Sequence, residues 1–409
     1  MNVKSWGNKM KLWQKNYNVY KEIEAFTVGN DYLLDKKLVK YDCLASIAHA
    51  KMLGKIKVLK KQEVVKLVKT LKQIIFLHEK GKFEIKQQDE DCHTAIENFL
   101  VKKLGNVGKK IHTARSRNDQ VLVALRLYEK HELVETKKLL AVLKKALINI
   151  IKKNGNVKIP GYTHMQKAMP SSIKLWLGSF VYAIDDDIKQ LESVEKLINQ
   201  SPLGSAAGFG VPVFNIDKNF TAKQLGFNKV MQNPMYCQMS RGKFESSVIN
   251  VMTQVMATLN KLATDMIMFN MKEFGYISLP KQFCTGSSIM PQKNNPDVLE
   301  LIRAKYSVVL GEEFKVKSMI SNLISGYNRD MQLTKEPLMN SIEITKQSIE
   351  IMALVVNGTE LTKKNIDNCK KAMTLELYAT EEAYKLVKKG MSFRDAYKKV
   401  GIALEKQDL

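Results

Sequence analysis

Long stretches without glycine or proline constrain the fold of this chain more than any other feature. Only 21 glycines and 9 prolines occur among 409 residues, and residues 109–154 contain neither. Because these two residue types most often interrupt regular structure, such stretches predict long helices. From Gly242 onward the apolar positions advance by threes and fours, through Val248, Val251, Val255, Leu259, Leu262, Met266 and Phe269. This spacing predicts a long helix that buries one stripe in a bundle.

Similar segments run over 171–200, from Pro296 into the 310s, and over 337–356. Strand-like alternating runs are brief, so the predicted class is all-α, with an elongated central bundle of about five long helices flanked by two smaller helical domains. The predicted boundaries are an N-terminal helical domain over 1–108, a central bundle with the chemical motifs over 109–357, and a short C-terminal helical domain over 358–409. Long helices commonly bury remaining apolar faces against other subunits, which predicts a homo-oligomer.

The chain is strongly basic, with a formal net charge of +24. A basic surface raises nucleic acid as a partner, but the 58 lysines are spread along the chain without a dense block. Only seven arginines occur, and most of them fall in the motifs described below. Since the planar arginine fork suits carboxylates, we expect small acidic ligands and no specific nucleic acid.

Cysteine use and hydropathy indicate the compartment. The five cysteines include no Cys-x-x-Cys pair, which predicts reduced thiols in or near the core and neither a disulfide framework nor a metal site. Cys284 lies near a reactive-looking loop, but no mechanism on that loop requires a thiol nucleophile. No signal-peptide segment or run of membrane-spanning length is seen, so we expect a cytoplasmic protein without a membrane partner.

One segment, residues 286–300, combines a serine loop with a lysine, an amide and a carboxylate. Gly286 and the serines after it suit unusual backbone conformations, and Asn295 followed by Pro296 and Asp297 predicts a helix that starts there with Asn295 as its N-cap. Backbone amides at a helix N-terminus favour anions. An ordinary loop is the alternative, but the combination is typical of a site for proton abstraction.

A second motif, residues 111–120, places the guanidinium groups of Arg115 and Arg117 beside hydroxyl and amide donors. Such a cluster suits the binding of carboxylates, although a solvated helix start with Ser116 or Asn118 as its cap explains it as well. Further motifs are residues 161–166, which include Thr163 and His164, and residues 327–332 followed by Lys335.

Taken together, these motifs resemble the fumarase and aspartase superfamily and, within it, the argininosuccinate lyase family. The resemblance extends from about Lys11 to Arg394. It implies reversible elimination of argininosuccinate to L-arginine and fumarate in arginine biosynthesis, without a metal or organic cofactor. It also implies a homotetramer whose active sites each draw on three subunits.

The resemblance also assigns roles to single residues. Ser287 matches the general base, and Lys293 would stabilise both its alkoxide and the dianion that forms when a proton leaves the carbon beside a carboxylate. His164 is paired in the family with the glutamate matched by Glu300, for acid catalysis or a water relay. The substrate-binding residues implied are Thr27, Ser116, Arg117, Asn118, Thr163, Asn295, Tyr327, Gln332 and Lys335. His93 is a weaker candidate.

The sequence departs from the family pattern in two places. Residues 14–17 replace a Gly-Gly-Arg-Phe segment, and residues 236–242 replace an Asp-x-x-Ser-x-Arg-Asp segment. Two alternatives therefore stay open: another fumarate-releasing lyase that acts on adenylosuccinate or aspartate, and a non-catalytic protein on the same scaffold. Because Ser287, Lys293, His164 and Glu300 are all present, the argininosuccinate reaction is favoured.

Overall fold

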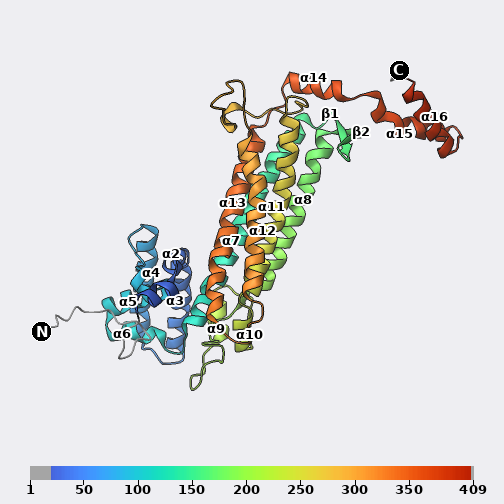
Figure 1. Cartoon of the computed structure of the whole chain (residues 1–409). Helices are drawn as coiled ribbons and strands as arrows, with labels where there is room; N and C mark the ends of the chain where they lie inside the picture. The colour runs from blue at the N-terminus through green and yellow to red at the C-terminus, as the bar shows by residue number, and fades with distance from the viewer. Residues whose placement is uncertain (1–19, 407–409) are drawn as a thin grey trace. The chain divides into compact units, whose positions relative to one another are not determined.

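Five long helices dominate the computed structural model, which describes residues 20–406 (Figure 1). They are α7 (Arg117–Asn154), α8 (Ile173–Ile198), α11 (Lys243–Asn270), α12 (Asp297–Met319) and α13 (Lys335–Gly358). The chain forms two compact units, each made of three separate stretches, and each of the five helices has residues in both.

The predicted apolar stripe of α11 is buried, from Val248 to Phe269. Polar groups between neighbouring helices add specific contacts: the Trp176 indole N–H donates to Asp265 over 2.9 Å, and the Thr258 hydroxyl donates to Asp187 over 2.8 Å. Burial of one stripe per helix supplies most of the stabilisation of such a bundle.

Unit 1 comprises the described part of Met1–Glu135 together with Leu191–Asn250 and Glu312–Ile342. Besides parts of the long helices, its α-helices are α1 (Lys21–Val28), α2 (Asp31–Leu34), α3 (Val39–Lys55), α4 (Lys61–Glu79), α5 (Cys92–Leu104), α6 (Asn106–Lys109), α9 (Lys218–Gln224) and α10 (Pro234–Met239). Its short 3-10 helices are η1 (Asp35–Lys37), η2 (Gln87–Asp89), η3 (Lys110–His112) and η5 (Arg329–Thr334), and its strands β3 (Gln200–Ser201) and β4 (Lys229–Val230) pair in parallel. One apolar cluster contains Ala45, Val123, Leu203, Ala222, Phe227 and Val230.

Unit 2 comprises Thr136–Gln190, Val251–Gly311 and Glu343–Leu409, of which the last three residues lie outside the described range. It contains the antiparallel hairpin of β1 (Lys158–Thr163) and β2 (Gln166–Ser172). Its remaining helices are η4 (Lys281–Phe283), α14 (Lys363–Ala372), η6 (Leu375–Tyr378), α15 (Ala379–Lys388) and α16 (Phe393–Glu405). An aromatic cluster of Tyr162, Trp176, Phe269, Phe274 and Tyr276 packs beside the hairpin.

The structure confirms the all-α class and the five long helices, with two differences at helix starts. Helix α12 begins at Asp297, one residue later than expected, because the Pro296 carbonyl accepts the first helical hydrogen bond, from the Glu300 N–H over 3.3 Å. Helix α13 begins at Lys335, two residues before Pro337. The three consecutive domains predicted from the sequence stay a prediction.

The five cysteines are free thiols, and all but Cys284 are buried. Among residues 20–406, no helix combines the length and the apolar character that crossing a membrane would require. The sequence departure at residues 14–17 lies outside the described residues.

Candidate active site

A cavity of about 210 Å³ in unit 1 collects the largest group of predicted binding residues. Its lining contains five of them, Arg117, Asn118, Tyr327, Gln332 and Lys335. The rest of the lining is Val28, Asp31, Glu90, Asp91, Val121, Arg241 and Arg329. A small polar cavity with both signs of charge suits a zwitterionic or multiply charged small molecule better than an apolar one.

The start of α7 is fixed by Asp119, a residue that was assigned no role in the sequence analysis. The fully buried Asp119 carboxylate accepts hydrogen bonds from the backbone N–H groups of Ser116 (2.9 Å), Gly204 (3.1 Å) and Ala206 (3.0 Å). Burial raises the pKa of Asp119, although these three donors oppose the shift. Asp119 therefore joins the Ser116 turn to the loop after Pro202, and its Ser-x-x-Asp spacing is a helix-start signal that could have identified it.

The Arg117 side chain is directed to protein carboxylates. Its guanidinium lies 3.0 Å from Glu90 and 3.1 Å from Asp91, and it donates to the Thr94 hydroxyl over 2.8 Å. Burial alone would lower the pKa of Arg117, but Asp91 and Glu90 outweigh it and raise that pKa. All three guanidinium nitrogens are thus engaged within the chain, and the residue also lines the cavity.

Lys335, which is 1% exposed, lies between two carboxylates. Its ammonium is 2.7 Å from Asp35 and 2.9 Å from Asp31. Burial opposes the charged form, but Asp35 and Asp31 raise the pKa of Lys335 above its ordinary value. Burial and the neighbouring Asp35 in turn raise the pKa of Asp31 to about 6 against the opposing effect of Lys335. The lysine is therefore a fixed positive charge at the cavity wall.

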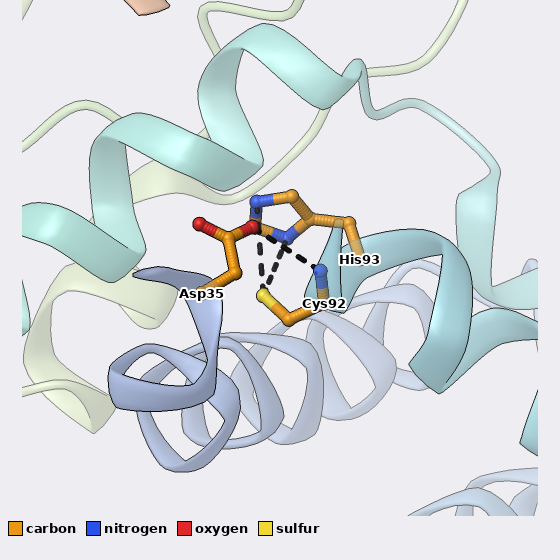
Figure 2. Close-up of side chains that lie close together, drawn as sticks. All are labelled: Asp35, Cys92 and His93. Carbon is orange, nitrogen blue, oxygen red and sulfur yellow. Dashed lines mark hydrogen bonds between the residues drawn. The ribbon is translucent and has the colours of Figure 1, made fainter. Parts of the chain in front are cut away.

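Asp35, Cys92 and His93 lie close enough together to be considered as metal ligands (Figure 2). One Asp35 oxygen already contacts the Lys335 ammonium, and the other accepts the Cys92 N–H over 3.1 Å. The His93 ring nitrogen lies 3.1 Å from Asp42, which raises the pKa of His93 against the opposing effect of burial. A metal ion would have to displace these partners, so the cluster fits a buried ion-pair network better than a metal centre.

Segments around Thr27 and residues 327–335 meet beside the cavity. The Thr27 carbonyl accepts hydrogen bonds from Arg329 (2.9 Å) and Gln332 (3.0 Å), and Arg329 also donates to the Gln332 side-chain oxygen over 3.0 Å. The Thr27 hydroxyl bonds the Ile23 carbonyl within α1, so this residue contributes its backbone to the arrangement. Arg241 is buried with its guanidinium over the Tyr327 ring, 5.3 Å from the centroid.

The predicted catalytic residues lie in unit 2, on the serine loop, in the first turn of α12 and on the β1–β2 turn. In the serine loop, the Ser287 hydroxyl accepts hydrogen bonds from the N–H groups of Met290 (3.2 Å) and Ile289 (3.4 Å). The base of the loop is closed by Thr285 and Asn295, whose backbones exchange hydrogen bonds of 3.0 and 2.8 Å. Asn295, predicted as the helix N-cap, instead serves this closure, and its side chain donates to the Gly286 carbonyl over 3.3 Å.

The remaining unit 2 residues point to solvent. Lys293 and Glu300 are exposed on and after the serine loop, and Thr163 and His164 are exposed at the end of the β1–β2 hairpin. Within the described part of the chain, no residue lies in ion-pair or hydrogen-bond contact with the His164, Lys293 or Glu300 side chains. The pairing of His164 with Glu300 implied by the resemblance is therefore not formed within this chain.

The histidines assigned no role behave as structural residues where they are buried. His49 bonds the Thr113 carbonyl over 2.9 Å, and burial lowers the pKa of His49 to about 3. His112 lies 3.4 Å from Glu97.

Comparisons with known proteins identify the family and the fold of the chain. The family model described as "Lyase" matches residues 21–311. The argininosuccinate lyase of Thermotoga neapolitana is 50% identical over 95% of this chain and 97% of its own length. Among solved structures, EDDS lyase in complex with formate superposes with a TM-score of 0.80 at 21% identity, covering 96% of this chain and 78% of that one. The class II fumarase of Schistosoma mansoni gives a TM-score of 0.74 at 17% identity, over 92% and 91% of the two chains.

The structural matches establish the helical fold, and the sequence matches are long enough to settle membership. This chain belongs to the lyase family and, within it, to the argininosuccinate lyases.

Proposed function

We propose that this chain is a carbon–nitrogen lyase that reversibly converts argininosuccinate to L-arginine and fumarate. The observation that carries the chemistry is the environment of Ser287. Its hydroxyl oxygen accepts hydrogen bonds from two backbone N–H groups of its own loop. Such donors stabilise an oxyanion, and Lys293 lies in the same loop. The loop therefore suits an activated serine that removes a proton.

In the proposed reaction, Ser287 first loses its hydroxyl proton to solvent, and the resulting alkoxide takes the proton from the carbon beside a succinyl carboxylate. The resulting dianion collapses with cleavage of the C–N bond, which leaves fumarate, and the departing guanidinium nitrogen receives a proton. His164 supplies that proton directly or through water, and Lys293 stabilises the charge on the dianion.

The substrate would bind with its remaining groups in the unit 1 cavity. Asn118, Tyr327 and the Lys335 ammonium offer donors to carboxylates, while Asp31 offers an acceptor to a cationic group. Ser116, Thr163 and Asn295 complete the proposed binding set. Arg117, Thr27 and Gln332 support it through their contacts with other residues of unit 1.

We further propose that the active site is shared between chains of a homotetramer. His164, Lys293 and Glu300 of unit 2 are exposed and have no side-chain partner among the described residues. Residues of another copy of the chain can therefore contact them. Several large apolar side chains are also exposed on the long helices of unit 2, namely Val142, Leu175, Tyr182, Leu301 and Val308. Such residues on long helices favour burial against another subunit. A cytoplasmic location is proposed as well, because free buried thiols suit a reducing compartment.

The test is to incubate the purified protein separately with argininosuccinate, adenylosuccinate and aspartate, and to follow fumarate by ultraviolet absorbance. We expect fumarate from argininosuccinate alone. Release from another donor would keep the chemistry and overturn the substrate, and no release from any would refute the activity.

A further inference from the structure

The turn that presents His164 has an unusual backbone. Strands β1 and β2 are joined by only two residues, His164 and Met165, with Thr163 paired to Gln166. Both turn residues have positive φ, +51° and +60°. Turns of this kind normally use Asn-Gly or Asp-Gly, since few side chains tolerate the left-handed region. Histidine is tolerated there better than most residues, but methionine is not.

A strained turn persists only when its surroundings hold it. The strand pair directly before the turn is Tyr162 with Lys167, and each of these side chains is anchored elsewhere in unit 2. The Tyr162 hydroxyl lies 2.8 Å from the Tyr276 hydroxyl, and the Tyr162 ring packs edge-on against Phe274 with centroids 5.9 Å apart.

Tyr276 is itself a rigid anchor. It is 3% exposed, its N–H donates to the Phe269 carbonyl over 2.9 Å, and its ring contacts Phe274 with centroids 5.6 Å apart. A buried tyrosine fixed by its backbone and its neighbours can hold the hydroxyl of Tyr162 in one place.

Strand β2 is anchored by residues from the C-terminal part of the chain. The Lys167 ammonium donates to the Thr374 hydroxyl over 3.0 Å and lies 3.7 Å from the Glu376 carboxylate. Glu376 belongs to η6, a segment that contains none of the predicted site residues. Both strands are thus fixed one residue pair before the histidine.

We propose that Tyr276, through Tyr162, and the segment of Thr374 and Glu376, through Lys167, form a clamp that holds the His164–Met165 turn in its strained form. Tyr276 is a positioning residue: it acts on His164 through Tyr162. The clamp gives the residues after α14 a part in catalysis. This inference rests on the proposed function, because it requires that His164 act in turnover.

The first test is Tyr276→Phe, which removes one oxygen and keeps the ring. The hairpin then loses its hydroxyl anchor, and we expect kcat to fall about 10- to 100-fold with KM changed less than about twofold, as for a small misplacement of a catalytic group. Tyr384→Phe, on the exposed face of α15, is the matched control and should keep wild-type kinetics. Unchanged kcat in Tyr276→Phe would overturn the clamp.

A rescue experiment separates positioning from general destabilisation. Glycine adopts the left-handed region freely, so Met165→Gly should restore much of the lost kcat in the Tyr276→Phe background. A structural defect elsewhere would not respond to that change, and failure of the rescue would contradict the role of turn strain.

Two further variants keep the outcome interpretable. If Tyr276→Phe fails to fold, Lys167→Met tests the other anchor, with a smaller fall in kcat expected because its contacts are partly exposed; no fall would overturn the proposal. His164→Ala tests the underlying function. Loss of turnover in His164→Ala together with normal kcat in Tyr276→Phe would refute the clamp alone, whereas full turnover in His164→Ala would refute the assigned histidine and with it the clamp.

Discussion

The two units treat their charged groups in opposite ways. In unit 1, Lys335 and Arg117 are engaged by two carboxylates each. In unit 2, Lys293 and Glu300 are exposed, without partners among the described residues. The difference fits the proposal that unit 1 holds a preformed binding surface and that the catalytic groups of unit 2 meet residues from other chains. Preorganised charges cost stability when one member is lost, while exposed ones do not.

The largest expected effect is on turnover, from Ser287→Ala in unit 2. Removing the base should lower kcat by at least about a thousandfold, near the upper range for general acid–base catalysis. The melting temperature should change little, because the hydroxyl accepts only two long hydrogen bonds. Ser288→Ala, the neighbouring exposed serine, is the control and should retain activity. Comparable kcat values in the two variants would remove Ser287 as the base.

The same substitution at two lysines contrasts the units directly. Lys335→Met leaves the buried Asp35 and the partly buried Asp31 without their cation, which should cost about 3–5 kcal/mol of unfolding free energy. Lys293→Met should leave stability unchanged and lower kcat by about 100-fold or more. Denaturant unfolding and steady-state kinetics measure both. Equal loss of stability in the two variants would contradict the comparison.

The effect of Asp119→Asn should be intermediate and should appear mainly in binding. The carboxylate accepts hydrogen bonds from three N–H groups, and an amide has only one oxygen to accept them. The Ser116 turn should therefore loosen, with a loss of about 1–3 kcal/mol of unfolding free energy. We expect KM to rise more than kcat falls. Hydrogen exchange should speed up at residues 116–120 and 204–206, and unchanged exchange there would contradict the role of Asp119.

A further effect concerns the pH dependence of stability. Burial and the nearby Glu245 raise the pKa of Glu129 from 4.5 to about 8, against the opposing effect of Arg126. Because the folded-state pKa is the higher one, stability is full below about pH 4.5 and falls as the pH rises toward 8. Glu129→Gln should flatten that fall and raise the melting temperature at pH 8 relative to the parent chain. An identical pH profile in the two proteins would refute this account of Glu129.

The sequence predicted the long helices well, because their apolar stripes and the lack of breakers are local signals that survive in the fold. The roles assigned to the serine loop and to residues 111–120 stay predictions, although Arg117 and Asn118 do line the unit 1 cavity. It missed Asp31 and Asp35, since their partner Lys335 lies some 300 positions away and no local pattern joins them. The N-cap at Asn295 was wrong because the Thr285 bridge competes for that residue, which a single-sequence pattern does not reveal.

The most direct test of the central proposal is mixing of two inactive chains. Asn118→Ala removes a proposed binding residue from unit 1, and Ser287→Ala removes the proposed base from unit 2. A homo-oligomer of either variant should therefore be inactive. If sites are shared between chains, mixtures that have exchanged subunits should regain up to about a quarter of wild-type activity. After random exchange, about a quarter of the sites combine an intact unit 1 half from one chain with an intact unit 2 half from another. Activity that never exceeds the sum of the two separate variants would show that each chain builds its own site.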